Sequence, residues 1–129
     1  MAFHNITLGF EGRVATLTVS RPEVRNALDT ATVAEMHQAL EEVRVARSTV
    51  LVVTGAGDKA FCAGADLKER AGMRDEEVHA FHEGLRAAFR GIEQAPQVFV
   101  AALNGATLGG GFELALACDL RIAADSALM

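Results

Sequence analysis

Two glycine-flanked turns constrain this chain more than any other feature of its sequence. The first is Phe61-Cys62-Ala63-Gly64-Ala65-Asp66, and the second is Gly109-Gly110-Gly111-Phe112-Glu113, which opens an apolar helical run. Glycine lacks a Cβ atom, so the main-chain N–H groups of such turns can approach a bound molecule closely. Two N–H groups aimed at one point form an oxyanion hole, which stabilises negative charge on a carbonyl oxygen. The pair of turns therefore indicates chemistry on an activated carbonyl.

Glu113 stands next to the second turn and is the first candidate for a proton-transferring group. It lies three residues after Gly110, so the two residues share one face of the expected helix. A carboxylate there can move protons next to a carbonyl bound at the same place, and we expect Glu113 to lie in a mostly apolar pocket. The alternative is a solvated glutamate that only stabilises the start of the helix. This segment alone does not separate the two.

Composition excludes several functional classes. The chain has 129 residues, of which 50% are hydrophobic, and this is enough for one domain with its own core. A net charge of −5, with only two lysines, argues against binding to nucleic acid or to anionic membranes. No apolar run is long enough for a membrane span, and the first residues do not resemble a signal peptide. We therefore expect a soluble cytoplasmic protein.

The cysteines and two of the histidines are candidates for nucleophilic or metal chemistry. Without a secretion signal, Cys62 and Cys118 are expected to be small buried hydrophobes and not a disulfide. A nucleophilic Cys62 needs a nearby cation, and the local sequence supplies none. His79 and His82 lie one helical turn apart and could ligate a metal, but no third ligand is near them in the sequence. We therefore favour structural roles for all four and expect no metal site.

Hydrophobic periodicity predicts an α/β fold with a mostly parallel sheet, in the order ββαβαβαβ. The expected strands are 5–10, 14–19, 49–54, 97–103 and 120–124, and the expected helices are 31–47, 75–94 and 109–118. Residues 11–13 form the turn of an initial hairpin. The last helix is almost entirely apolar after Glu113, so we expect it to be buried.

Local signals suggest how some of these elements begin. The helix at 31–47 starts either with a capping box of Thr32 and Glu35 or with a single cap by Asp29. Asp66 is expected to cap a helix after the first glycine turn. Residues 55–60 read Gly-Ala-Gly-Asp-Lys-Ala, a partial dinucleotide-binding fingerprint. A true fingerprint opens directly into a helix, whereas Phe61 and Gly64 follow here, so we favour a longer loop.

Four motifs in this order resemble the crotonase superfamily, which contains the enoyl-CoA hydratases and isomerases. The motifs are Arg21-Pro22 with Asn26-Ala27-Leu28, residues 61–68, Asn104-Gly105 with residues 108–115, and Cys118-Asp119 with the strand after it. The resemblance implies a spiral of ββα units with a mostly parallel sheet, truncated, with residues 1–129 as the N-terminal part of a single domain. It also implies an acyl-CoA thioester as substrate and no separate cofactor.

By this resemblance, the N–H groups of Ala65 and Gly110 bind the thioester oxygen, and Glu113 is one of two glutamates that hold and activate water. The second glutamate of the family would fall a few residues beyond Met129. The implied substrate- and CoA-binding residues are Val24, Leu28, Ala63, Ala65, Asp66, Leu67, Lys68, Gly109 and Gly110. Lys68 is either a solvated surface residue or a contact of the CoA phosphates.

The resemblance favours a hydratase, which adds water across the α,β double bond of a 2-enoyl-CoA, because the family's isomerases mainly use the later glutamate. The alternatives are an isomerase and a truncated, non-catalytic CoA-binding or assembly module. Residues 66–71 and 113–129 look most like the methylglutaconyl-CoA hydratase subgroup. Some of its members bind AU-rich RNA through the helix at 31–47, but here that helix has no lysine, so we expect no RNA binding. A full-length chain is expected to form a homotrimer or a dimer of trimers.

Overall fold

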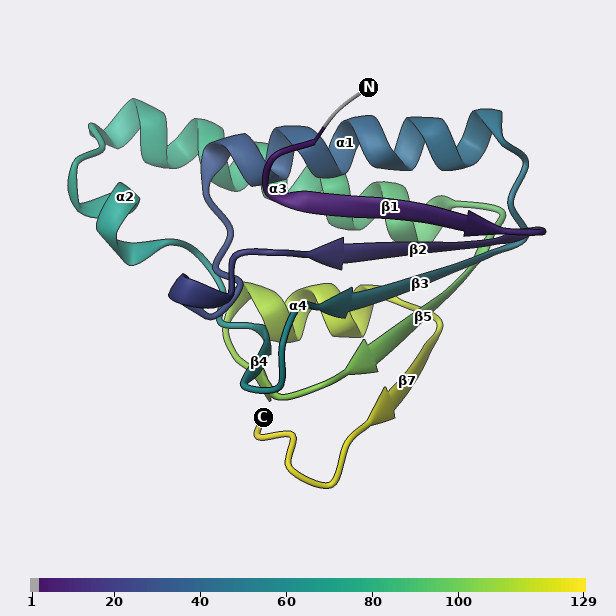
Figure 1. Cartoon of the computed structure of the whole chain (residues 1–129). Helices are drawn as coiled ribbons and strands as arrows, with labels where there is room; N and C mark the ends of the chain where they lie inside the picture. Colours follow the sequence, from purple (N-terminus) through teal and green to yellow (C-terminus); the bar gives the residue numbers. More distant parts are fainter. Residues whose placement is uncertain (1–2) are drawn as a thin grey trace.

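The computed structural model describes residues 3–129 and contains one main sheet with helices packed against it (Figure 1). The main sheet has the strand order β1-β2-β3-β5-β7, in which β1 is antiparallel to β2 and all other neighbours are parallel. A second parallel sheet pairs β4 with β6. This is the α/β fold with a mostly parallel sheet that the sequence predicts.

The bounds of the elements agree closely with the hydrophobic pattern. The strands are β1 (Ile6–Glu11), β2 (Val14–Val19), β3 (Val50–Gly55), β4 (Ala60–Cys62), β5 (Val98–Leu103), β6 (Ala106–Thr107) and β7 (Leu120–Ala123). The helices are the 3-10 turn η1 (Pro22–Val24), α1 (Thr30–Val45), α2 (Leu67–Ala71), α3 (Asp75–Gln94) and α4 (Gly110–Ala117). The expected order lacks β4, β6, η1 and α2, because segments of two to five residues are too short to show a period. Only the predicted cap by Asp66 indicates α2.

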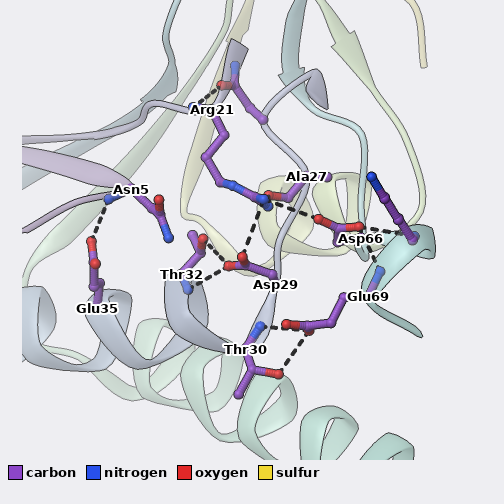
Figure 2. Close-up of polar contacts among 11 residues, drawn as sticks. Asn5, Arg21, Ala27, Asp29, Thr30, Thr32, Glu35, Asp66 and Glu69 are labelled. Carbon is purple, nitrogen blue, oxygen red and sulfur yellow. Dashed lines mark hydrogen bonds and ion pairs between the residues drawn. The ribbon is translucent and has the colours of Figure 1, made fainter. Parts of the chain in front are cut away.

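The N-terminal hairpin leads into the first crossover helix, α1. Gly12 in the hairpin turn has a φ of +60°, which glycine adopts without strain. Asp29 caps α1, since its carboxylate accepts the N–H of Thr32 at 2.8 Å. The alternative capping box of Thr32 and Glu35 is wrong. The Glu35 carboxylate instead accepts the N–H of Asn5 at 2.9 Å, ahead of β1 (Figure 2).

The core lies between the main sheet and the helices. α1 packs against α3 and against β1 and β2, while α4 packs against α3, β4 and β6. The largest fully buried apolar side chains are Phe61, Phe99, Leu17, Leu28, Met36, Leu51 and Leu114. Within residues 3–129, no helix combines the length and the apolar character that crossing a membrane requires.

The last helix, α4, is less buried than the sequence predicts. Phe112 and Leu116 of α4 are 39% and 56% exposed, so the expectation that this helix is buried is wrong. One face of α4, with Gly111 and Leu114, packs inward, and no element among the described residues covers the other face. All four residues of β7, the last strand in the sheet order, are also exposed.

Candidate active site

The first glycine turn, residues 63–66, lies between β4 and α2 and is paired with the segment that precedes α1. Leu28 and Ala65 form an isolated parallel bridge. In this bridge the Leu28 N–H donates to the Gly64 carbonyl at 2.7 Å, and the Asp66 N–H donates to the Leu28 carbonyl at 2.9 Å. The bridge therefore uses the Gly64 carbonyl and the Asp66 N–H, which are the main-chain groups on either side of the Ala65 N–H. That N–H itself has no hydrogen-bond acceptor among residues 3–129.

The second glycine turn places another free N–H group beside the first. Gly109 has a φ of +52°, and Gly110 is the first residue of α4, where N–H groups lack a partner within the helix. Its N–H has no acceptor in the described part of the chain. A Cβ atom built on Gly110 would lie 3.9 Å from the Ala65 nitrogen, and one built on Gly64 would lie 3.1 Å from the Gly110 nitrogen. The two free N–H groups therefore belong to adjacent main-chain segments, as an oxyanion hole requires.

Gly111 explains how α4 comes so close to the first turn. A Cβ atom at this position would overlap the carbonyl group of Cys62, so a side chain here would push α4 away from β4. The Leu108 N–H donates to the same carbonyl at 3.1 Å. The end of β4 and the start of α4 are thus joined directly, and this contact sets the distance between the two turns.

A pocket of about 420 Å³ opens beside the two free N–H groups. Its lining residues come from both turns and from α2, α3 and α4, and they are Ala63, Gly64, Ala65, Leu67, Arg70, His82, Leu85, Arg86, Phe89, Gly109, Gly110 and Glu113. The Glu113 side chain is exposed. The surroundings of Glu113 are mixed, because the apolar side chains of Leu67, Leu85 and Phe89 share the pocket wall with Arg70, His82 and Arg86.

The predicted binding residues divide into two groups. The pocket brings together Ala63, Ala65, Leu67, Gly109, Gly110 and Glu113. The residues that do not line it are Val24, Leu28, Asp66 and Lys68. Leu28 is fully buried and contributes through its main-chain bridge to the first turn. Lys68 is exposed outside the pocket.

Asp66 has the capping role that the sequence predicts. Its Oδ1 atom accepts the N–H groups of Lys68 and Glu69 at 3.0 and 3.1 Å, at the start of α2. The hydrogen bond from Glu69 and the nearby Arg21 guanidinium hold the pKa of Asp66 below its ordinary value. Asp66 is therefore an ionised anchor for the first turn.

Sequence reasoning missed the polar part of the pocket wall. The spacing of His79 and His82 suggests only a metal site, and nothing in the local sequence indicates that Arg70 or Arg86 lines a pocket. His82, Leu85, Arg86 and Phe89 follow the i, i+3, i+4, i+7 spacing of one helix face. That spacing could have identified a shared face, but only the contact between α3 and α4 shows that the face borders the second turn.

Other chemistries find no support in the described residues. Cys62 and Cys118 are free and buried, as predicted. Burial raises the pKa of the Cys62 thiol to about 11 and that of Cys118 to about 12, so neither is an activated nucleophile. The loop after β3 leads into β4 and not into a helix, which excludes the dinucleotide fingerprint. Residues 3–129 contain no group of three or more His, Cys, Asp or Glu side chains placed to hold a metal ion.

Comparison with known proteins identifies the family. The family model described as enoyl-CoA hydratase/isomerase matches residues 9–129. The chain belongs to this family. One similar member is the enoyl-CoA hydratase domain-containing protein 2, mitochondrial, of Bos taurus, which is 45% identical over 90% of this chain and 40% of its own length. Another is the short-chain-enoyl-CoA hydratase of Clostridium acetobutylicum, 40% identical over 98% of this chain and 49% of its own length.

Solved structures confirm that the chain has the crotonase fold of this family. An enoyl-CoA hydratase from Bacillus anthracis matches with a TM-score of 0.92 and 45% identity, over 96% of this chain and 49% of that chain. An enoyl-CoA hydratase/carnithine racemase from Magnetospirillum magneticum matches with a TM-score of 0.91 and 37% identity. The chain spans about half the length, or less, of the relatives that it matches.

Proposed function

We propose that the natural protein containing this chain is a hydratase that adds water across the α,β double bond of a 2-enoyl-CoA thioester. The observation that carries this proposal is the pair of free N–H groups at Ala65 and Gly110, which border one pocket. Two such donors suit a thioester oxygen on which negative charge develops. The relatives named short-chain-enoyl-CoA hydratase, from Clostridium acetobutylicum, and crotonyl-CoA hydratase, from Syntrophomonas wolfei, support the same reaction class.

In the proposed mechanism, the main chain polarises the substrate and Glu113 handles a proton. Hydrogen bonds from Ala65 and Gly110 draw electron density toward the thioester oxygen, so the β-carbon becomes electrophilic. Water attacks that carbon while Glu113 accepts one of its protons. The electron pair of the double bond moves onto the oxygen as an enolate, which the two N–H groups stabilise. A second acid, expected beyond Met129, then protonates the α-carbon. These steps balance without a metal or a separate cofactor.

The proposed acyl group is methylglutaconyl-like. Residues 66–71 and 113–129 resemble that hydratase subgroup. A methylglutaconyl group ends in a carboxylate, and Arg70 and His82 line the pocket together with Arg86, which is already paired with Glu83. Arginine forms strong, directional hydrogen bonds with carboxylates. This wall therefore supports an anionic acyl group in preference to a plain alkyl chain.

We also propose a cytoplasmic protein that forms a homotrimer or a dimer of trimers and does not bind RNA. The surface of α1 supports the last point. Its Arg44 side chain pairs with Glu41, with Nε and Oε2 2.9 Å apart, so this arginine is partly neutralised. RNA binding depends on uncompensated cations that contact phosphates. A sequence-selective shift in gel mobility that persists in high salt would contradict this proposal.

The substitution Glu113→Gln in the natural protein tests the hydratase. We expect kcat for hydration of methylglutaconyl-CoA or crotonyl-CoA to fall by about 100-fold or more, with little change in thioester affinity measured by calorimetry. Glu93→Gln is the matched control, because Glu93 is exposed near the end of α3 and does not line the pocket. Equal turnover in Glu113→Gln and in the control would exclude the proposed role of Glu113.

A non-catalytic CoA-binding or assembly module is the second candidate. Glu113 is the only acidic residue that lines the pocket within residues 3–129, and hydration requires two proton transfers. Thioester binding without turnover in the natural protein would favour this candidate, whereas migration of the double bond without uptake of water would indicate an isomerase.

The intact mass of the natural protein is the first measurement to make. A mass near twice the 13.6 kDa of this chain would leave room for the second glutamate.

A further inference from the structure

Arg21 lies at a junction between the segment that precedes α1 and the first glycine turn, and it contacts both. It follows β2, and its side chain is only 14% exposed. One guanidinium nitrogen, Nη1, donates to the Ala27 carbonyl at 2.8 Å. The other, Nη2, lies 3.2 Å from Asp66 Oδ2 and 3.3 Å from Asp29 Oδ2. Figure 2 shows the Arg21 side chain extended between these three acceptors.

Each of the two carboxylates that Arg21 contacts also caps a helix. Asp29 uses Oδ1 to cap α1 by accepting the N–H of Thr32. Asp66 uses Oδ1 to cap α2. Each therefore offers its second oxygen, Oδ2, to the same guanidinium. Arg21 joins the starts of two helices that are far apart in the sequence.

The main-chain bridge between Leu28 and Ala65 lies within this junction. Ala27 and Asp29 flank Leu28 on one segment, and Asp66 follows Ala65 on the other. Arg21 thus contacts both paired segments next to the bridge. The bridge uses the polar groups on both sides of the Ala65 N–H, so the orientation of that N–H depends on how the two segments are aligned.

The charge and shape of arginine suit this position. The side chains of Asp29 and Asp66 are only 17% and 13% exposed, and they would repel each other without a cation between them. Arginine presents several N–H donors in a rigid plane, whereas the single ammonium of lysine cannot reproduce that fork. Arg44 provides a contrast, because it forms an exposed pair with Glu41 on the surface of α1.

We propose that Arg21 is a positioning residue that, by holding the segments of Leu28 and Ala65 together, directs the Ala65 N–H toward the oxygen of the bound thioester. Arg21 does not line the pocket, so it acts through the main chain and not on the substrate. This inference rests on the proposed function. A purely structural Arg21 would change stability but not the properties of the thioester bound to the folded protein.

The first experiment follows amide exchange in the natural protein for Arg21→Lys, Arg21→Met and the control Arg44→Met. We expect both Arg21 variants to lose protection at the N–H groups of Leu28 and Asp66, which form the bridge, and to retain it in β3. Arg44→Met should match the wild type at all of these sites. Retained protection at Leu28 and Asp66 in Arg21→Lys would overturn the proposal, even if Arg21→Met does not fold.

The second experiment measures the thioester carbonyl directly. A 2-enoyl-CoA labelled with ¹³C at its carbonyl is bound to each variant, and its C=O stretching band is recorded by infrared difference spectroscopy. Polarisation by N–H donors lowers that frequency, so we expect a smaller downshift in Arg21→Lys than in the wild type. We also expect kcat to fall by about 10- to 100-fold, with KM changed by no more than about 3-fold. A wild-type downshift and wild-type kcat in Arg21→Lys would overturn the inference.

The two proposals fail in different ways. If the wild-type protein neither shifts the carbonyl band nor hydrates the thioester, the proposed function fails, and the inference about Arg21 fails with it. If the wild type does both and the Arg21 variants match it, only the inference fails.

Discussion

Asn26 and Asn104 donate to the same atom, the main-chain carbonyl oxygen of Ala60, at 2.8 and 3.0 Å. Asn26 also donates to Ala56 and accepts the N–H of Arg21. Asn104 also donates to Gly57 at 2.9 Å. The side-chain amides of these two residues, which are far apart in the sequence, both bind the loop after β3. Because this loop leads into β4, they also fix the strand that carries the first glycine turn.

The substitution Asn26→Asp should be strongly destabilising. Asn26 is fully buried, and aspartate cannot donate to the carbonyls of Ala56 and Ala60 when it is ionised. We expect the free energy of unfolding to fall by about 3 kcal/mol, because buried acceptors lose their partner and a charge lies against them. Denaturant titration measures this change. Asn104→Asp is the control at a half-buried position, and an equal loss in both variants would contradict the role of burial.

Gly111→Ala and Gly91→Ala make a matched pair of helical glycine substitutions. The added Cβ at position 111 would overlap the Cys62 carbonyl, whereas position 91 has no atom within 4 Å. We expect Gly111→Ala to destabilise the protein by about 1–3 kcal/mol. Gly91→Ala should stabilise it by about 0.5–1 kcal/mol, because alanine favours the helix. Thermal or denaturant unfolding tests both signs, and a stabilising Gly111→Ala would show that α4 is not fixed against β4.

The two cysteines should be unreactive in the folded protein. Both thiols are buried, and their raised pKa values, about 11 for Cys62 and about 12 for Cys118, keep them protonated near neutral pH. We expect iodoacetamide to label neither thiol at a measurable rate under native conditions and to label both in denaturant. The modified sites are counted by intact mass. Rapid native labelling of Cys62 would contradict the burial of β4.

The lowered pKa of Asp66 predicts how the free energy of unfolding changes in acid. Its folded pKa is lower than its ordinary value of 3.8, so the folded state favours the ionised form. This contribution is fully present above pH 3.8 and is lost as the pH falls through the folded pKa. Asp66→Asn should therefore be less stable than the wild type near neutral pH, and the difference should shrink below pH 3.8. Unfolding titrations of both proteins across this range test the sign, and a constant difference would contradict it.

Long periodic elements could be predicted from the sequence. The helix at 75–94 has the bounds of α3, since its apolar residues recur every three or four positions and three acidic residues occupy its first turn. The two glycine turns could also be placed, because clustered glycines indicate turns whose main-chain N–H groups a bound molecule can approach. Asp66 as a cap follows from local chemistry alone.

Properties that depend on contacts between distant segments could not be predicted. The exposed side chains of Phe112 and Leu116 look like core residues in the sequence, because composition does not say which face of a helix is covered. Arg86 forms an ion pair with Glu83 within α3, so its sequence context suggests only a surface residue. Its place in the pocket wall depends on where α3 lies relative to α4.

The two free N–H groups at Ala65 and Gly110 belong to the main chain, and this changes how the site responds to mutation. A substitution at either position leaves the donor in place, unless the new residue is proline. A substitution at Ala65 or Gly110 therefore acts through the space that the new side chain occupies, whereas a substitution at a residue that aims the donors changes the direction of the N–H group itself. Among residues that do not line the pocket, we expect substitutions at Gly111, Asn26 and Arg21 to cause the most severe losses of activity.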